Sequence, residues 1–441
     1  MVKIIACPLQ YTSSEGNKDD SNTPVISMKT FLNSIIANKK NIQSSSKYID
    51  QFSFSFLNIG VVLFASRFLS NEQASRYIVF NSYSSLSLIV TSAFIVGPFW
   101  IFGADKSTQA SYYKFSIKSL LILSTFFSLI LSVVFYLNER DWVYSGLLLV
   151  ASVSSSSYDF LRKSLYISKN EKTSAVMSLS LLIATSLSYF LLHYYRLNDA
   201  RIYLLTLASC TAIIAICIGI YNRKHFKVMS GMANIKRKTY EYWDIGKWSA
   251  ASMICFWSIT QGSFIFLEKC ISDEQLVFSR LALSLSGIIA IYYTSIENKM
   301  MPELRGLILE SRTDALQTAK KKYYKNGVIV SILFSISTLT FYSQIFGINY
   351  HHLSILFLMC FYQSLTGIFR FDAYVLKAMK FHKVIFFSNF ISAGIVYIPI
   401  FYTITSSQLT NTEYLLPIII LLNGLLCSLL YRLFLTSRKG L

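Results

Sequence analysis

Long apolar stretches separated by short polar segments make up most of the chain. A helix that crosses the hydrocarbon of a bilayer needs about 20 mostly apolar residues, because each residue adds about 1.5 Å. We identify about twelve stretches of this kind, and each satisfies its own backbone hydrogen bonds in lipid if it is helical. The pattern predicts transmembrane helices over residues 52–68, 77–102, 117–137, 142–160, 174–194, 202–221, 248–267, 276–296, 327–347, 352–370, 383–404 and 414–434.

The composition supports lipid as the solvent of these stretches. Of 441 residues, 53% are hydrophobic and 14% are charged, whereas an average soluble domain contains about 25% charged residues. A soluble core cannot hide this much apolar surface from water. We therefore predict an all-α polytopic membrane protein with about twelve transmembrane helices.

Basic residues are distributed unevenly among the connections. If the N-terminus lies in the cytoplasm, few of the 41 lysines and arginines fall outside the cytoplasmic segments. Because cytoplasmic loops are enriched in Lys and Arg, both termini are predicted to be cytoplasmic. The net charge of +19 then reflects contact with anionic lipid and needs no nucleic-acid partner. The exceptions are Arg67, Arg76, Arg140, Arg196, Arg201 and Lys269 in outer connections, and Arg280 within a span.

The predicted spans divide into two sets of six. In the N-terminal tail, Pro24 suits the first position of a helix, and residues 24–38 are predicted to form a short helix on the inner membrane surface. The predicted parts are the cytoplasmic tail 1–49, the first six-helix bundle 50–221, the basic cytoplasmic linker 222–245 and the second six-helix bundle 246–441.

Similar stretches occupy equivalent places in the two halves. LSNEQ (69–73) follows the first span and ISDEQ (271–275) follows the seventh, while Asp50 and Asp244 precede these spans. Because six is an even number, the two halves share one orientation and form a parallel repeat. Two packed halves around a central cleft are the layout of an alternating-access transporter. Asp50 and Asp244 are then paired residues at the cleft entrance, or helix N-caps.

Three stretches carry a resemblance to a known family: RFLSNEQASRYIVFNSYSS (67–85), GKWSAAS (246–252) and GIFRFDAYVLKAMKFHKV (367–384). They look like the O-antigen and polysaccharide flippases of the multidrug/oligosaccharidyl-lipid/polysaccharide exporter (MOP) superfamily. The chain departs from the family at Ala74-Ser75, where members usually carry glycine. The resemblance implies a bacterial inner-membrane protein that moves an undecaprenyl-diphosphate-linked oligosaccharide from the cytoplasmic to the periplasmic leaflet. It also implies a cleft with cationic side chains.

Arginine suits such a cargo, because the planar guanidinium donates parallel hydrogen bonds to phosphate oxygens. Arg280 lies about one turn inside the eighth span, where a charge is costly and usually faces a cavity. Arg67 and Arg76 lie at the outer ends of the first two spans. We expect these three arginines in the substrate cleft; the alternative for each is contact with the lipid headgroups.

Polar and acidic residues supply further candidates. Asn58 and Gln261 lie near the middles of the first and seventh spans, where they line the cleft or hydrogen-bond between helices. Asp159, near the inner end of the fourth span, is a candidate for coupling transport to H⁺ or Na⁺. Arg162 follows three residues later, so an ion pair between the two is the alternative.

Two other functions are weighed against the flippase. A drug or small-molecule antiporter of the same superfamily is expected to place carboxylates deep in its spans, and here the mid-span regions are almost free of acid. An O-antigen polymerase or acyltransferase needs a large extracytoplasmic loop for its catalytic groups, whereas each such connection here has about ten residues or fewer. The sequence has no P-loop and no metal-binding motif. We therefore expect a transporter without enzyme activity, cofactor or metal, whose partners are the lipid-linked oligosaccharide and membrane lipids.

Overall fold

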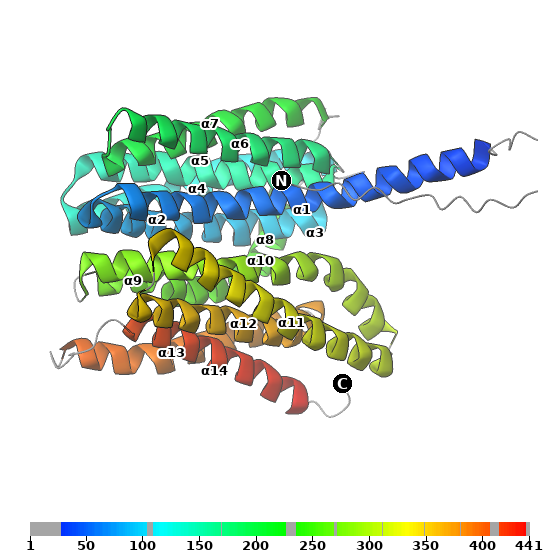
Figure 1. Ribbon diagram of the computed structural model, residues 1–441. Coiled ribbons are helices and arrows are strands. Elements are labelled where there is room, and N and C mark those ends of the chain that lie inside the picture. Colours follow the sequence, from blue (N-terminus) through cyan, green and yellow to red (C-terminus); the bar gives the residue numbers. More distant parts are fainter. Residues whose placement is uncertain are drawn as a thin grey trace, which may run out of the picture. The chain divides into compact units, whose positions relative to one another are not determined.

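The regular structure of the described chain is entirely helical (Figure 1). The computed structural model describes residues 28–103, 109–168, 170–225, 235–268, 271–310, 312–347, 349–379, 381–405 and 414–437. The first half contains α1 (Met28–Phe68), α2 (Asn71–Thr91), the π-helix η1 (Ser92–Val96), α3 (Gly97–Phe102), α4 (Gln109–Glu139), α5 (Trp142–Ile167), α6 (Glu171–Tyr194) and α7 (Ala200–His225). The second half contains α8 (Ile235–Trp257), the π-helix η2 (Ser258–Gly262), α9 (Ser263–Leu267), α10 (Asp273–Leu309), α11 (Thr313–Phe346), α12 (Tyr350–Ala378), α13 (His382–Thr405) and α14 (Leu415–Ser437).

The helices confirm the predicted fold class. Within the described residues, 10 helices are long and apolar enough to cross a membrane. The other two predicted spans are also helical: α5, which carries a serine run and Asp159, and α13, whose apolar part His382–Ile398 is shorter. Every predicted span therefore coincides with a helix of a polytopic membrane protein. Continuous helices of this kind follow from the need to satisfy backbone groups inside lipid.

The chain differs from the prediction near its N-terminus. α1 is one helix from Met28 to Phe68, so no non-helical connection separates the predicted helix 24–38 from the first span. Residues 39–51 contain neither Pro nor Gly, and nothing in them breaks a helix. The predicted start at Pro24 lies outside the described residues. Residues 28–45 belong to a different unit from Ser46 and the residues after it.

The predicted linker 222–245 is helical at both of its described ends, because α7 ends at His225 and α8 begins at Ile235. The early part of α8 packs against η1 of the first half. The ring of Trp243 stacks on that of Phe94 at 5.6 Å between centroids. Gly246 permits this approach, since a Cβ there would lie 2.5 Å from Phe94. α8 also contacts α13, so it joins the two halves.

The repeated LSNEQ and ISDEQ stretches are helix starts. Ser70 caps α2 by accepting from the backbone N–H of Gln73. Ser272 and Gln275 form a reciprocal capping box at α10, with both donor–acceptor distances at 3.3 Å. The two similar stretches therefore have the same local role, which is to cap the start of a helix.

Asp50 and Asp244 are not helix N-caps, the alternative to a place at the cleft entrance, because both lie inside helices. Asp50 is fully buried. The side chain of Asp244 is 59% exposed and pairs with Lys247 at 2.8 Å. The two aspartates are therefore not equivalent in their surroundings, although they precede equivalent spans.

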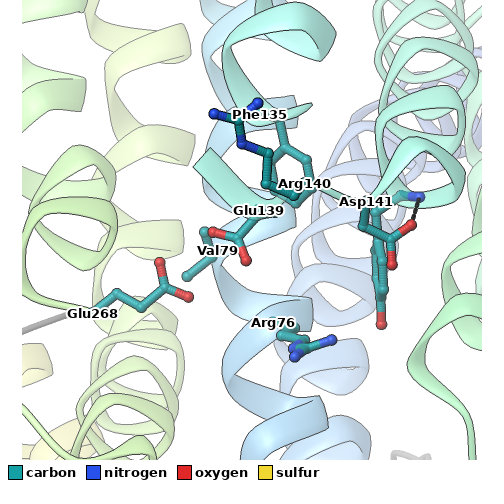
Figure 2. Close-up of a pocket in the computed structure, with 8 residues that line it drawn as sticks. Arg76, Val79, Phe135, Glu139, Arg140, Asp141 and Glu268 are labelled. Atoms are coloured by element: carbon teal, nitrogen blue, oxygen red, sulfur yellow. Dashed lines mark hydrogen bonds between the residues drawn. The ribbon is translucent and has the colours of Figure 1, made fainter. Parts of the chain in front are cut away.

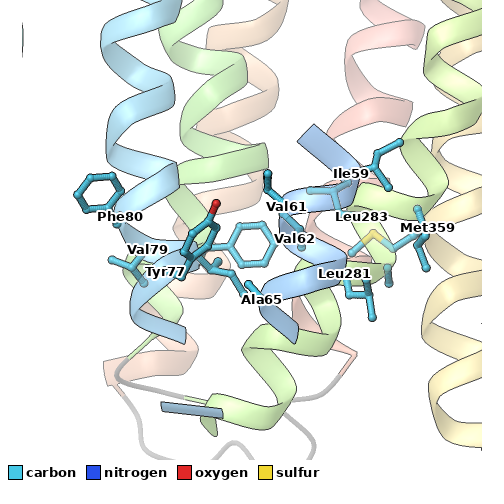
Figure 3. Packing of buried hydrophobic residues seen from close by; sticks show 14 of the residues in the cluster. Ile59, Val61, Val62, Ala65, Tyr77, Val79, Phe80, Leu281, Leu283 and Met359 are labelled. Carbon is cyan, nitrogen blue, oxygen red and sulfur yellow. The ribbon is translucent and has the colours of Figure 1, made fainter. Parts of the chain in front are cut away.

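The α1–α2 and α4–α5 turns, the end of α9 and the start of α10 lie at one end of the bundle, at the left in Figure 1. We call it the outer end, after the predicted orientation. Apolar side chains of α1, α2, α10 and α12 belong to one buried cluster that extends through both halves of the bundle (Figure 3). Ile59 and Val62 of α1 lie in it with Leu283 of α10 and Met359 of α12. The two halves are thus in apolar contact.

Candidate functional site

Arg280 is a buried cation in the second turn of α10. The residue is 8% exposed, and its Nη1 donates a hydrogen bond to Oε1 of Gln261. The guanidinium carbon lies 5.4 Å from the ring centroid of Phe264. Within the described residues Nε has no hydrogen-bond partner, and no ion pair to a carboxylate is found. A buried charge of this kind is costly unless an anion or further hydrogen bonds compensate it.

Gln261 belongs to the π-helix η2, which lies between α8 and α9. A π-helix inserts extra backbone into a helix, and such insertions are frequent at functional sites. At the start of η2, Nε1 of Trp257 donates to the backbone oxygen of Ser82 at 3.0 Å and to Oγ of Ser85 at 2.9 Å. Both serines belong to α2, so the segment that carries Gln261 is hydrogen-bonded to the first half.

Three tyrosines of the first half are linked by hydrogen bonds. The hydroxyl of Tyr77 in α2 lies 3.3 Å from that of Tyr189 in α6, and Tyr189 donates to the backbone oxygen of Tyr203 in α7 at 3.0 Å. All three are buried. Tyr77 shares an apolar cluster with Leu281, which follows Arg280 (Figure 3). Sequence reasoning missed these residues, because nothing in the pattern distinguishes them among 29 tyrosines.

The other predicted cleft residues lie elsewhere. The guanidinium of Arg67 is exposed and lies 5.8 Å from the ring of Phe346. Arg76 is 47% exposed and pairs with Glu72 one turn earlier at 3.0 Å. Asn58 is exposed and donates to a backbone oxygen of its own helix. Among the described residues, no hydrogen bond or ion pair joins these three to Arg280 or Gln261.

A second charged site, which we call the inner clamp, joins α1, α5 and α6. Asp50 accepts from Nη1 of Arg162 at 2.9 Å, and Nη2 of Arg162 donates to Asp159 at 3.2 Å. Lys163 donates to the second oxygen of Asp159 at 2.7 Å. Asp50 also accepts from three hydroxyl groups, which belong to Tyr166, Ser174 and Ser178.

The inner clamp is electrically balanced, because its two carboxylates face one arginine and one lysine. The predicted ion pair between Asp159 and Arg162 is confirmed, and Asp50 joins it as an unexpected partner. Both Asp50 oxygens are occupied by donors, as are both oxygens of Asp159. A transported cation can bind here only by displacing one of these donors. The coupling role of Asp159 stays a prediction.

In the part of the chain that the structure describes, no group of three or more His, Cys, Asp or Glu side chains is placed to hold a metal ion.

Comparison with known proteins identifies the fold. No family model and no curated protein matches the sequence. Solved structures do match, with each alignment covering at least 90% of this chain. An outward-facing multidrug resistance MATE family transporter of the MOP superfamily aligns with a TM-score of 0.60, 11% identity and 94% of its chain.

Two further structures give the same result. A MOP superfamily transporter from Pyrococcus furiosus aligns at a TM-score of 0.62, with 10% identity over 94% of its chain. A Vibrio cholerae MATE transporter aligns at 0.61, with 11% identity over 98% of its chain. The chain has the MOP transporter fold. This is the superfamily of the polysaccharide flippases that the sequence resembles, and identities this low show the fold alone.

Proposed function

We propose that the protein is a flippase that moves a lipid-linked oligosaccharide with an anionic diphosphate from the cytoplasmic to the periplasmic leaflet of a bacterial inner membrane. The observation that carries this proposal is the buried guanidinium of Arg280, which is held by Gln261 without a carboxylate partner among the described residues. A diphosphate supplies the negative charge that this guanidinium lacks.

The contrast with Arg162 strengthens the argument. Arg162 is buried as deeply, but two aspartates neutralise it and an aromatic ring covers it. It serves the fold and needs no ligand. Arg280 has an amide oxygen and the face of Phe264 instead, and both interact with a cation without cancelling its charge. Its remaining donors suit phosphate oxygens, which accept from guanidinium groups in parallel pairs.

The cargo has a physical requirement that this arrangement meets. A diphosphate and its sugars cannot cross hydrocarbon unaided, because each desolvated polar group costs several kcal/mol. A cation at the contact between the halves offsets part of that cost while the polyprenyl chain stays in lipid. A membrane potential that is negative inside adds about 2.3 kcal/mol per charge per 100 mV for an outward-moving anion.

One of the matching structures is relevant to the positive charge that Arg280 gives this site. The Pyrococcus furiosus transporter is described as having a binding pocket of reverse polarity that suggests a different function. Pocket charge thus varies within this fold. The buried cation Arg280 fits an anionic cargo better than a cationic drug.

The alternative is a cation-coupled multidrug antiporter, favoured by the MATE transporters among the matching structures and by the buried Asp50 and Asp159. Coupling to H⁺ or Na⁺ through Asp159 requires the ion to replace Lys163, whose side chain is 26% exposed and is the most accessible member of the inner clamp. The charge balance of the clamp favours a structural role, and therefore the flippase.

The test is to delete the gene in its native host and to measure which leaflet holds the lipid-linked oligosaccharide. Accumulation in the cytoplasmic leaflet, with loss of surface polysaccharide, is the expected result. Normal leaflet distribution together with increased drug sensitivity would refute the flippase and establish the antiporter.

A further inference from the structure

Two tyrosine hydroxyls of the first half lie near the buried guanidinium of the second half. The hydroxyl oxygens of Tyr77 in α2 and Tyr189 in α6 are 3.3 Å apart. Tyr77 is fully buried, and its hydroxyl is close enough to Arg280 for the two groups to interact electrostatically. Because Tyr77 and Arg280 belong to different halves, a ligand between them contacts both halves at once.

Tyr77 and Arg280 lie at about the same level along the bundle. The segment α8–η2–α9 runs toward the outer end, whereas α2 starts there. Trp257 of this segment is hydrogen-bonded to Ser82 of α2. Counted from that bond, Tyr77 is five residues closer to the outer end and Gln261 is four, which correspond to about 7.5 Å and about 6 Å. Gln261 accepts a hydrogen bond from Arg280, so the tyrosine and the guanidinium are level with each other.

The hydrogen bonds of the two tyrosines determine which hydroxyl can donate to a ligand. Tyr189 donates to the backbone oxygen of Tyr203 at 3.0 Å, and a phenol has a single proton. The proton between the two hydroxyls is therefore that of Tyr77. Their separation of 3.3 Å exceeds the about 2.7–2.8 Å that is typical of O–H···O bonds. Tyr77 therefore loses only a weak hydrogen bond when it turns its proton to a stronger acceptor.

Arg280 also has a donor that the protein does not use. Its Nε has no hydrogen-bond partner among the described residues, while its Nη1 donates to Gln261. A diphosphate carries several anionic oxygens, and hydrogen bonds to ionised acceptors are roughly twice as strong as those between neutral groups. A phenol is neutral, so Tyr77 can add a donor to the guanidinium without adding like charge beside it.

A pocket at the outer end, where the two halves meet, suits an anion less well (Figure 2). Its volume is about 120 Å³, enough for a few water molecules. Carboxylates outnumber guanidinium groups in its lining, so it disfavours a diphosphate. The charged lining residues are Arg76, Glu139, Arg140, Asp141 and Glu268.

We propose that Tyr77 is a second ligand of the cargo's diphosphate, which binds between Arg280 of the second half and Tyr77 of the first. Arg280 supplies the positive charge, and Tyr77 donates one hydrogen bond. The bound anion links the two halves and is released when they separate at the outer end. This proposal rests on the proposed function, because it requires a diphosphate at Arg280.

The test is the affinity of the purified protein in nanodiscs for farnesyl diphosphate, a short polyprenyl diphosphate, measured by isothermal titration calorimetry. Empty nanodiscs correct for partition into lipid, and farnesol measures binding of the chain alone. Tyr77→Phe removes the proposed donor and should weaken the binding of farnesyl diphosphate about tenfold, because hydrogen bonds to charged groups contribute more than those between neutral groups. Farnesol should not distinguish this variant from the wild type.

Tyr189→Phe is the matched control. It removes the same hydrogen bond between the two tyrosines, and also the bond to Tyr203, but it leaves the Tyr77 hydroxyl in place. This variant should bind farnesyl diphosphate at least as tightly as the wild type, because the proton of Tyr77 then has no competing acceptor in Tyr189. Arg280→Ala should abolish binding.

Equal weakening by Tyr77→Phe and Tyr189→Phe would overturn the proposal, because the two tyrosines would then act only through the fold. Unchanged affinity in Tyr77→Phe, together with loss of binding in Arg280→Ala, would remove Tyr77 from the site and leave the flippase proposal standing. Wild-type affinity in Arg280→Ala would contradict the anion site itself, and with it the proposed function.

Discussion

Replacing one charged residue of the inner clamp should lower the free energy of unfolding by more than the loss of its hydrogen bonds alone. The reason is that the four charges of the clamp cancel only when all of them are present. Arg162 is 3% exposed and contacts both Asp50, which is fully buried, and Asp159, which is 5% exposed. Arg162→Leu leaves two buried carboxylates with one lysine. Asp50→Asn leaves two cations with one carboxylate. The double variant returns the site to zero net charge.

The expected losses of stability follow from this charge balance. Breaking a buried ion pair by removing one partner costs about 3–5 kcal/mol, since it strands a buried charge. Each single variant should lose stability in that range. The double variant should cost clearly less than the sum of the singles, with a coupling energy of about 2–3 kcal/mol.

The assay is the free energy of unfolding, measured by titrating dodecyl sulfate into mixed micelles of the purified protein. The exposed pair Arg76–Glu72 provides a matched control, with side chains 47% and 69% exposed. Arg76→Leu and Glu72→Gln should each cost less than about 1 kcal/mol and add independently. Additive costs in the inner clamp, or single-variant costs no larger than those of the control pair, would refute the charge-balance reasoning.

Two further predictions concern packing. Gly367→Ala places a Cβ 2.1 Å from the ring of Tyr293, which is fully buried, so it should destabilise the protein by about 1–3 kcal/mol in the same titration. Gly394→Ala is its control and should be neutral or stabilising, because the added Cβ meets nothing within 4 Å. If both variants lowered the free energy of unfolding equally, the close contact between Gly367 and Tyr293 would be contradicted. Trp257→Phe removes the N–H donated to Ser82 and should cost about 1–2 kcal/mol, and an unchanged unfolding free energy would show that this bond does not stabilise the contact between the halves.

The helices were predictable because lipid restricts the choice of structure. A long apolar stretch in a bilayer must be helical, and every predicted span coincides with a helix. Helix ends in polar segments were less predictable, because apolar periodicity does not mark them. α1 extends through 39–51 and α8 begins at Ile235, where no proline interrupts the helix but the sequence has no lipid-length apolar run.

The charged sites were predictable only where their partners are close in sequence. The pair of Asp159 and Arg162 follows from a spacing of three residues. Asp50 and Arg162 are 112 positions apart in the sequence, so no local pattern predicts their contact. Arg280 and Gln261 were selected separately, for their positions within spans. Their hydrogen bond depends on how the segment that contains η2 packs beside α10, which no local sequence pattern predicts.

The flippase proposal requires that Arg280 binds the anionic part of the cargo. The most direct measurement compares the leaflet distribution of the lipid-linked oligosaccharide in a deletion strain that expresses the wild type, Arg280→Ala, Arg280→Lys or the control Arg76→Ala, at equal membrane abundance. Arg280→Ala should leave the cargo in the cytoplasmic leaflet, Arg280→Lys should restore transport partly because it keeps the charge but loses the bidentate geometry, and Arg76→Ala should resemble the wild type. Normal transport by Arg280→Ala would contradict the account.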